Sequence, residues 1–158
     1  MKIVFLDFDG PIIPTRVFAM NPGLLLEEPC RTSGALINEV LRRADAKLVV
    51  SSTWRKQGLE DCKVVLRKAN IDLSRLHFWW RTEDLYPLSR EDEIARWVKE
   101  RGGGDRGNEF IAIDDMPLYK LESKHRVQCS SDNGFLFEHY LEACEKLHVS
   151  PFNKPNPI

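Results

Sequence analysis

The chain has 158 residues, of which 42% are hydrophobic and 30% are charged, and its formal net charge is −1. These values are typical of a soluble globular domain, and they exclude a protein that holds nucleic acid through a large overall positive charge. The length suits one domain, which we expect to span residues 1–150. Residues 151–158 contain three prolines, and we expect them to form an irregular tail.

Cysteine spacing and hydropathy exclude further classes. The cysteines form no Cys-x-x-Cys pair, which argues against a zinc site or a redox dithiol, and a chain of this length needs no disulfides to complete its core. We therefore expect four reduced cysteines, at positions Cys30, Cys62, Cys129 and Cys144. The apolar run at the N-terminus is too short for a signal peptide, and no stretch approaches the length of a membrane span. We expect a cytoplasmic protein without a membrane partner.

Strand patterns recur along the chain in alternation with helix patterns. Three strands are predicted from continuous apolar runs, which are typical of strands buried on both faces, and two from weaker patterns. In chain order the five predicted strands cover residues 3–6, 48–50, 76–80, 110–113 and 126–129.

Apolar residues at helical spacing predict a helix after the first, second, third and fifth strands. We expect the first helix to start at Thr32-Ser33-Gly34. The third has the clearest start, because Ser89 can cap it and Asp92 stands in the capping-box position, and Gly102-Gly103-Gly104 should end it. The expected apolar faces are Ile37, Val40, Leu41 and Ala44; Leu59, Cys62, Leu66 and Ala69; Ile94, Trp97 and Val98; and Phe137, Tyr140, Leu141 and Cys144.

This alternation predicts an α/β fold, a three-layer Rossmann-like arrangement in which helices cover both faces of a parallel sheet. In such sheets ligands bind outside the carboxyl ends of the strands. Asp7, Ser51 and Asp114 each stand at the C-terminal end of a predicted strand. Three polar residues that are far apart in sequence should therefore meet at one edge of the sheet.

The first chemical motif is Phe5-Leu6-Asp7-Phe8-Asp9-Gly10. In an extended chain side chains alternate, so both carboxylates point the same way and repel each other unless a cation or a shared proton lies between them. Mg²⁺ is the natural cation for oxygen ligands of this kind. Taken alone, the motif fits an ordinary strand-ending turn equally well.

Three further motifs follow. Ser51 and Ser52 come after an apolar run, where a hydroxyl and free backbone N–H groups can cradle a phosphate. Arg90 begins the capped helix and could neutralise phosphate charge. Asp114-Asp115 follows a buried strand, where an acid pair costs desolvation unless it coordinates a metal. Each motif also has an explanation that involves no function. The serines could cap a turn, the arginine could be solvated, and the acid pair could form a turn.

The order of these motifs resembles the haloacid dehalogenase superfamily of phosphotransferases over about residues 2–137. The stretches Ser51-Ser52-Thr53-Trp54-Arg55, Glu93-Ile94 and Asp132-Asn133-Gly134 resemble more narrowly a bacterial and phage group of small phosphatase domains, some of which occur within RNA repair proteins. The chain departs from the superfamily pattern at two positions. Pro11 stands where Thr or Val is frequent, and Arg90 stands where Lys is usual.

The resemblance implies a division of labour. Asp7 is the nucleophile that becomes phosphorylated, and Asp9 is the acid and base, which favours a phosphatase over a dehalogenase. Mg²⁺ is held by Asp7, by the backbone carbonyl of Asp9, and by Asp114 or Asp115.

The resemblance also implies a phosphate site. Ser51, preferred to Ser52, binds phosphate oxygens, and Arg90 supplies the cation, with Lys99 and Lys120 as the other candidates for that charge. Arg55 is expected to contact the rest of the substrate. Trp54 either packs in the core or stacks on a base.

A large cap domain is not expected. About 22 residues (11–32) separate Gly10 from Ser33, enough for a flap hairpin, and residues 81–108 are mostly used by the capped helix. An open site suits a phosphorylated macromolecule, so the alternatives are a general phosphomonoesterase, a polynucleotide-end phosphatase of nucleic-acid repair, and a non-catalytic interaction domain. A response-regulator receiver is disfavoured, because there the acid pair precedes the phosphorylated aspartate.

Overall fold

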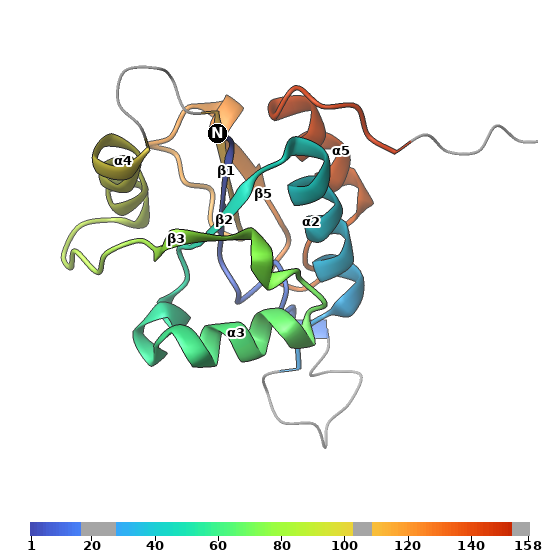
Figure 1. The fold of residues 1–158 in the computed structure, drawn as a ribbon, viewed down its shortest axis with the longest axis horizontal. Helices are drawn as coiled ribbons and strands as arrows, with labels where there is room; N and C mark the ends of the chain where they lie inside the picture. The colour runs from blue at the N-terminus through green and yellow to red at the C-terminus, as the bar shows by residue number, and fades with distance from the viewer. Residues whose placement is uncertain (17–27, 103–108, 153–158) are drawn as a thin grey trace, which may run out of the picture.

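A computed structural model describes residues 1–16, 28–102 and 109–152 of the chain. Within these residues five strands form one parallel sheet in the order β3-β2-β1-β4-β5 (Figure 1). This confirms the predicted parallel sheet, with β1 at its centre. The strands are β1 (Ile3–Leu6), β2 (Lys47–Val50), β3 (Leu76–Arg81), β4 (Phe110–Asp114) and β5 (Arg126–Gln128).

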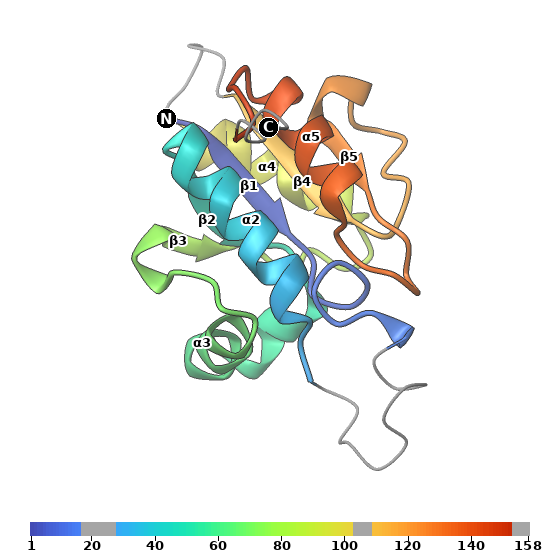
Figure 2. The same ribbon diagram turned by 90° about the vertical axis from the view of Figure 1, so that its right-hand side faces the viewer.

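Helices cover both faces of the sheet, as expected for a three-layer Rossmann-like fold. The α-helices in the described part of the chain are α2 (Arg31–Ala44), α3 (Leu59–Lys68), α4 (Arg90–Arg101) and α5 (Phe137–Lys146). In Figure 2, α2 and α5 lie on the near face and α4 on the far face. Short 3₁₀ helices complete the described elements: η1 (Thr53–Gln57), η2 (Leu73–Arg75) and η3 (Ser123–His125).

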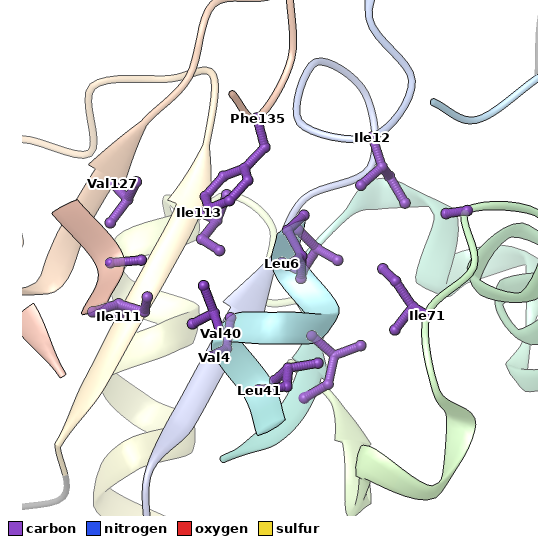
Figure 3. Close-up of a cluster of buried hydrophobic side chains, with 14 of the residues drawn as sticks. Val4, Leu6, Ile12, Val40, Leu41, Ile71, Ile111, Ile113, Val127 and Phe135 are labelled. Atoms are coloured by element: carbon purple, nitrogen blue, oxygen red, sulfur yellow. The ribbon is translucent and has the colours of Figure 1, made fainter. Parts of the chain in front are cut away.

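The core consists of two clusters, one on each face of the sheet. Alternate residues of β1 enter different clusters, because successive side chains of a strand point to opposite faces. Val4 and Leu6 pack with α2, α3 and α5 in the larger cluster, part of which is shown in Figure 3. Ile3 and Phe5 pack against α4, where the ring of Trp97 meets Phe5 edge to face at 5.3 Å. The central strand is therefore buried on both sides.

Two expectations about the helices were wrong in detail. Helix α2 begins at Arg31, ahead of the expected start signal, and Gly34 lies within its first turn. A Cβ at Gly34 would stand 1.7 Å from the carbonyl oxygen of Ala69, so the glycine allows α2 to approach the end of α3. In α5, Leu141 is 41% exposed, because the inward face is formed by Tyr140, Ala143 and Cys144.

Strand β3 forms an edge of the sheet. Its pairing with β2 shifts register between Leu48 and Val50, and the strand leaves Phe78 84% exposed. The two tryptophans of this strand, Trp79 and Trp80, differ in their surroundings. Trp79 is about half exposed, with the guanidinium of Arg101 4.2 Å from its ring centroid, whereas Trp80 packs partly against the larger cluster.

All four cysteines are free, and three of them are buried. Of the predicted tail, Pro151 and Phe152 are described, and the ring of Phe152 lies 4.9 Å from that of Tyr140. The rest of the tail (153–158) and half of the segment expected to form a flap (17–27 of residues 11–32) lie outside the described residues, so the boundary at residue 150 stays a prediction.

The described residues contain no inserted cap domain, since α4 and its flanking loop occupy the chain between β3 and residue 102. No helix among residues 1–16, 28–102 and 109–152 is both long enough and apolar enough to cross a membrane.

Candidate active site

The first motif follows the central strand. Asp7 is buried, and its backbone N–H donates to the carbonyl of Ile113 at 3.0 Å, which ties the end of β1 to β4. Phe8 points into the larger core cluster, and Asp9 is exposed. Gly10 has a φ of 97°, and a Cβ there would lie 2.7 Å from the Cβ of Asp115. Glycine is therefore required both by the turn and by the neighbouring acid.

Three carboxylates meet at the carboxyl ends of β1 and β4. Oxygen atoms of Asp7, Asp114 and Asp115 all lie within 4.8 Å of one another. One guanidinium nitrogen of Arg90 bridges two of them, at 3.0 Å from Asp7 Oδ2 and 2.6 Å from Asp114 Oδ2. The predicted convergence of Asp7 and Asp114 is thus present, with Arg90 beside both.

Burial makes this cluster electrostatically costly. Desolvation raises the pKa of Asp7, although Arg90 and a hydrogen bond from Ser52 act against it. Desolvation and the charge of Asp7 together raise the pKa of Asp114 to about 6, again against the effect of Arg90. Both shifts have the same leading cause, because burial disfavours the charged form of a carboxyl group.

The donor set fits Mg²⁺. Three ionised carboxylates and one guanidinium carry a summed charge of −3 + 1 = −2, which a divalent cation would balance. Carboxylate oxygens are the hard ligands that Mg²⁺ prefers. Asp115 is half-buried, and Ser131 orients it by donating a hydrogen bond to its Oδ2 at 2.9 Å. Asp7, Asp114 and Asp115 are therefore the residues that would hold the ion.

The loop after β2 supplies the hydroxyl at this site. Ser52 caps η1, its Oγ accepting the backbone N–H of Trp54 at 3.3 Å. The same hydroxyl hydrogen-bonds Asp7, an interaction that lowers the pKa of Asp7. Ser51 is also buried, and its backbone N–H continues the β1–β2 ladder by donating to Leu6 at 3.0 Å. In this geometry the hydroxyl that contacts Asp7 belongs to Ser52, whereas Ser51 was the expected phosphate contact.

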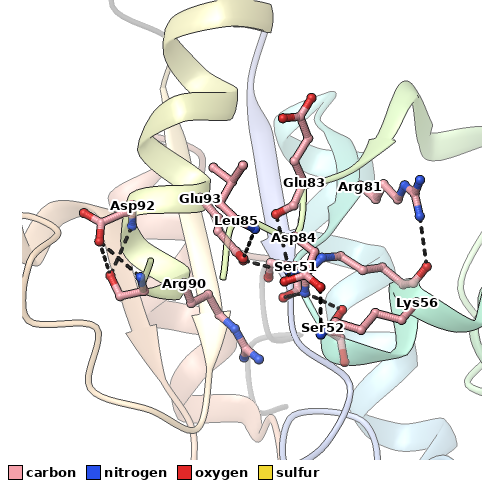
Figure 4. A network of polar contacts seen from close by, with 12 residues as sticks. Ser51, Ser52, Lys56, Arg81, Glu83, Asp84, Leu85, Arg90, Asp92 and Glu93 are labelled. Carbon is pink, nitrogen blue, oxygen red and sulfur yellow. Dashed lines mark hydrogen bonds and ion pairs between the residues drawn. The ribbon is translucent and has the colours of Figure 1, made fainter. Parts of the chain in front are cut away.

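Arg55 lies behind the loop that carries Ser51 and Ser52. This position does not agree with the expectation that Arg55 contacts substrate. Its side chain is 4% exposed and pairs with Glu93 of α4 at 2.9 Å. Glu93 and the loop serines Ser51 and Ser52 are labelled in Figure 4. Its other terminal nitrogen donates to the carbonyls of Ser51 and Ser52, at 3.2 and 2.9 Å. The buried guanidinium thus holds the loop from behind, because the alternative is an unpaired charge in the core.

Two partners at the site were not anticipated. One of them is Glu93. Its spacing could have indicated that it is buried, because it lies four residues before Trp97 and therefore on the buried face of α4. The other is Trp54, whose indole Nε1 donates to both carboxylate oxygens of Asp9, at 3.3 and 3.2 Å. No sequence spacing connects Trp54 to Asp9, because the contact joins loops that follow different strands.

The other candidates for the cation lie elsewhere. Lys120 pairs with Asp92 at 2.8 Å and contacts Ser89 at the start of α4. Lys99 is exposed in the last turn of α4. Within the described residues, Arg90 is therefore the cation that reaches the acid cluster.

Comparison with known proteins gives a match to a family model. No curated protein and no solved structure matches the chain. The model of the HAD domain in Swiss Army Knife RNA repair proteins matches residues 3–140, a span that includes every strand of the sheet and all the residues of the acid cluster. The chain therefore belongs to this family of haloacid dehalogenase (HAD) domains.

Proposed function

We propose that the protein is a Mg²⁺-dependent phosphomonoester hydrolase that works through an aspartyl-phosphate on Asp7. The observation that carries this proposal is the meeting of three carboxylates with the bridging guanidinium of Arg90. Such a cluster has little structural benefit of its own, because a buried excess of negative charge costs stability. A cation bound beside these carboxylates, together with a phosphate, would account for the cluster, because the cation would offset its electrostatic cost.

The proposed reaction proceeds in two displacements. A carboxylate oxygen of Asp7 attacks phosphorus, the bond from phosphorus to the ester oxygen breaks, and Asp9 gives that oxygen a proton. Asp9 then takes a proton from a water molecule that attacks the acyl-phosphate. This second step releases inorganic phosphate and regenerates Asp7.

The surrounding groups stabilise the charge that this chemistry moves. Arg90 and the hydroxyl of Ser52 both contact Asp7, so each can also reach oxygens of a phosphoryl group attached to it. Bound Mg²⁺ would offset the repulsion between carboxylate and phosphate. Trp54 holds the carboxylate of Asp9 in place through its indole N–H.

A second, narrower candidate is removal of phosphate from a polynucleotide end. The description of the family favours it, since that description names RNA repair proteins. The lack of a cap domain in the described residues also favours it, because an open site admits a polymer. A non-catalytic interaction domain is the competing reading, and the intact set of Asp7, Asp9 and Asp114 argues against it.

Hydrolysis of p-nitrophenyl phosphate in MgCl₂ tests the proposal. Asp7→Asn should reduce turnover to background and remove covalent phosphoryl labelling detected by mass spectrometry, because an amide is a poor nucleophile. Asp45→Asn is the matched control, since Asp45 is exposed and contacts only Arg75 among the ion pairs of the described residues. Near-normal turnover by Asp7→Asn would assign the nucleophile to another residue.

A further inference from the structure

A groove of about 600 Å³ lies between η1 and α3. One of its walls is a single face of α3, formed by Asp61, Val64, Val65 and Lys68 at helical spacing. Trp54 and Lys56 of η1 also line it. This volume is within the range of small-ligand pockets in proteins.

The groove begins at the proposed acid. Trp54 lines the groove and also donates its indole N–H to Asp9 at 3.2 Å. In the proposed reaction Asp9 protonates the ester oxygen as that oxygen leaves, in line with and opposite to the attack by Asp7. The atoms bonded to that oxygen must therefore lie on the Asp9 side, where the surface leads over Trp54 into the groove.

The groove offers both stacking and positive charge. The indole of Trp54 is half-buried, and Val64 is 44% exposed beside it, so an apolar surface faces solvent. Two lysines face the same space. Lys56 pairs with Asp84 at 2.8 Å, whereas Lys68 is exposed and forms no ion pair in the described part of the chain. Asp61 is the one acid among the lining residues.

This combination suits single-stranded nucleic acid. Every nucleotide presents a base that can stack on an aromatic ring and a phosphate that a lysine can contact, and both features repeat along the strand. A phosphopeptide carries neither feature at each residue. The mixture of one tryptophan, apolar surface and an unpaired lysine therefore fits a nucleotide better than it fits a peptide.

We propose that this groove binds the leaving-group nucleoside and the adjoining phosphodiester of a single-stranded polynucleotide whose end carries the phosphate to be removed. This proposal rests on the proposed phosphatase function. That function places the leaving oxygen at Asp9 and so sets the orientation of the polynucleotide in the groove. It assigns Lys68 to the adjoining phosphodiester and Trp54 to the base.

The experiment has a catalytic arm and a binding arm. The catalytic arm compares kcat/KM for uridine monophosphate and for hexauridylate, each phosphorylated at the 5′ or at the 3′ end, with a phosphoserine peptide run in parallel. The binding arm measures fluorescence anisotropy of labelled, phosphorylated hexauridylate on Asp7→Asn protein, which should not turn it over. The groove variant is Lys68→Glu. Its matched control is Lys99→Glu, an exposed lysine on α4, away from the groove.

We expect Lys68→Glu to lower the ratio of kcat/KM for hexauridylate to that for the mononucleotide about tenfold, and to weaken hexauridylate binding by a similar factor. The slope of log Kd against log salt concentration should fall by about 0.7, the value for one lost contact to a single strand. Lys99→Glu should leave both the ratio and the slope unchanged.

The two arms separate failure of the groove from failure of the enzyme. Binding that weakens in Lys68→Glu while the wild type hydrolyses no ester would support the groove and overturn the phosphatase. An unchanged kcat/KM ratio and unchanged binding in Lys68→Glu would overturn the groove, whatever the activity. Preference for the phosphopeptide, with a loss in Lys68→Glu, would replace the polynucleotide with a protein ligand.

Discussion

Breaking the buried ion pair between Arg55 and Glu93 should destabilise the fold strongly, and Glu93→Ala tests this. The two side chains are only 4% and 6% exposed, and their closest atoms are 2.9 Å apart. Removing one partner of a buried pair costs about 3–5 kcal/mol, because the remaining charge is left uncompensated. Arg55 would keep its contacts to the carbonyls of Ser51 and Ser52, so we expect about 3 kcal/mol, the low end of that range.

Urea unfolding followed by far-UV circular dichroism measures the change directly. For a chain of this length about 3 kcal/mol corresponds to a fall of about 6–12 °C in Tm. In the native protein the backbone N–H of Leu85 donates to Glu93 at 3.1 Å. Glu93→Gln retains an acceptor for this N–H, so we expect a smaller loss of stability, about 1–2 kcal/mol.

Glu100→Ala provides the matched control on the same helix. Glu100 pairs with Arg96 at 2.8 Å, but both side chains are about half exposed, so the expected loss is at most about 0.5 kcal/mol. If Glu93→Ala lost no more stability than Glu100→Ala, the reasoning from burial would be refuted.

Three further predictions concern the acid cluster and its neighbours, all measured as hydrolysis of p-nitrophenyl phosphate. Chelation of divalent cations should abolish turnover and added MgCl₂ should restore it, because the cluster would carry uncompensated charge without an ion; undiminished turnover in chelator would contradict the metal site. Ser52→Ala should reduce kcat about 10²–10³-fold, by analogy with the loss of one oxyanion donor, and Ser51→Ala should cost less; the opposite ranking would return the phosphate contact to Ser51. Arg90→Met should lower kcat by more than about 10²-fold, whereas Arg90→Lys should stay within about tenfold, since one nitrogen of Arg90 makes both carboxylate contacts; equal losses would show that the planar guanidinium is needed.

Much of the fold could be predicted because its signals are local. Continuous apolar runs indicated the strands at the centre of the sheet, since a strand covered by helices on both faces has no polar side. The capping box of Ser89 and Asp92 is present as expected. Leu141 shows the limit of such signals, because apolar spacing does not reveal which side of a helix has a neighbour.

The sequence by itself also determined which residues meet at the site. The carboxyl ends of neighbouring parallel strands share one edge, so residues that follow β1 and β4 had to converge, and Asp7 and Asp114 do so. This inference needs only the shared direction of the strands, which the alternation of strands and helices predicted; the strand order came from the structure.

Only the tertiary structure decided what each side chain contacts within that edge. Arg55 turned inward to Glu93, Ser52 reached Asp7, and Trp54 reached Asp9. Each contact joins segments that are separated in the sequence, and each depends on loop geometry of a few ångströms, which residue type and spacing do not specify. The sheet topology brings the site residues to one edge. Which of them form hydrogen bonds and ion pairs with one another depends on how buried polar groups compete for partners in a packed interior.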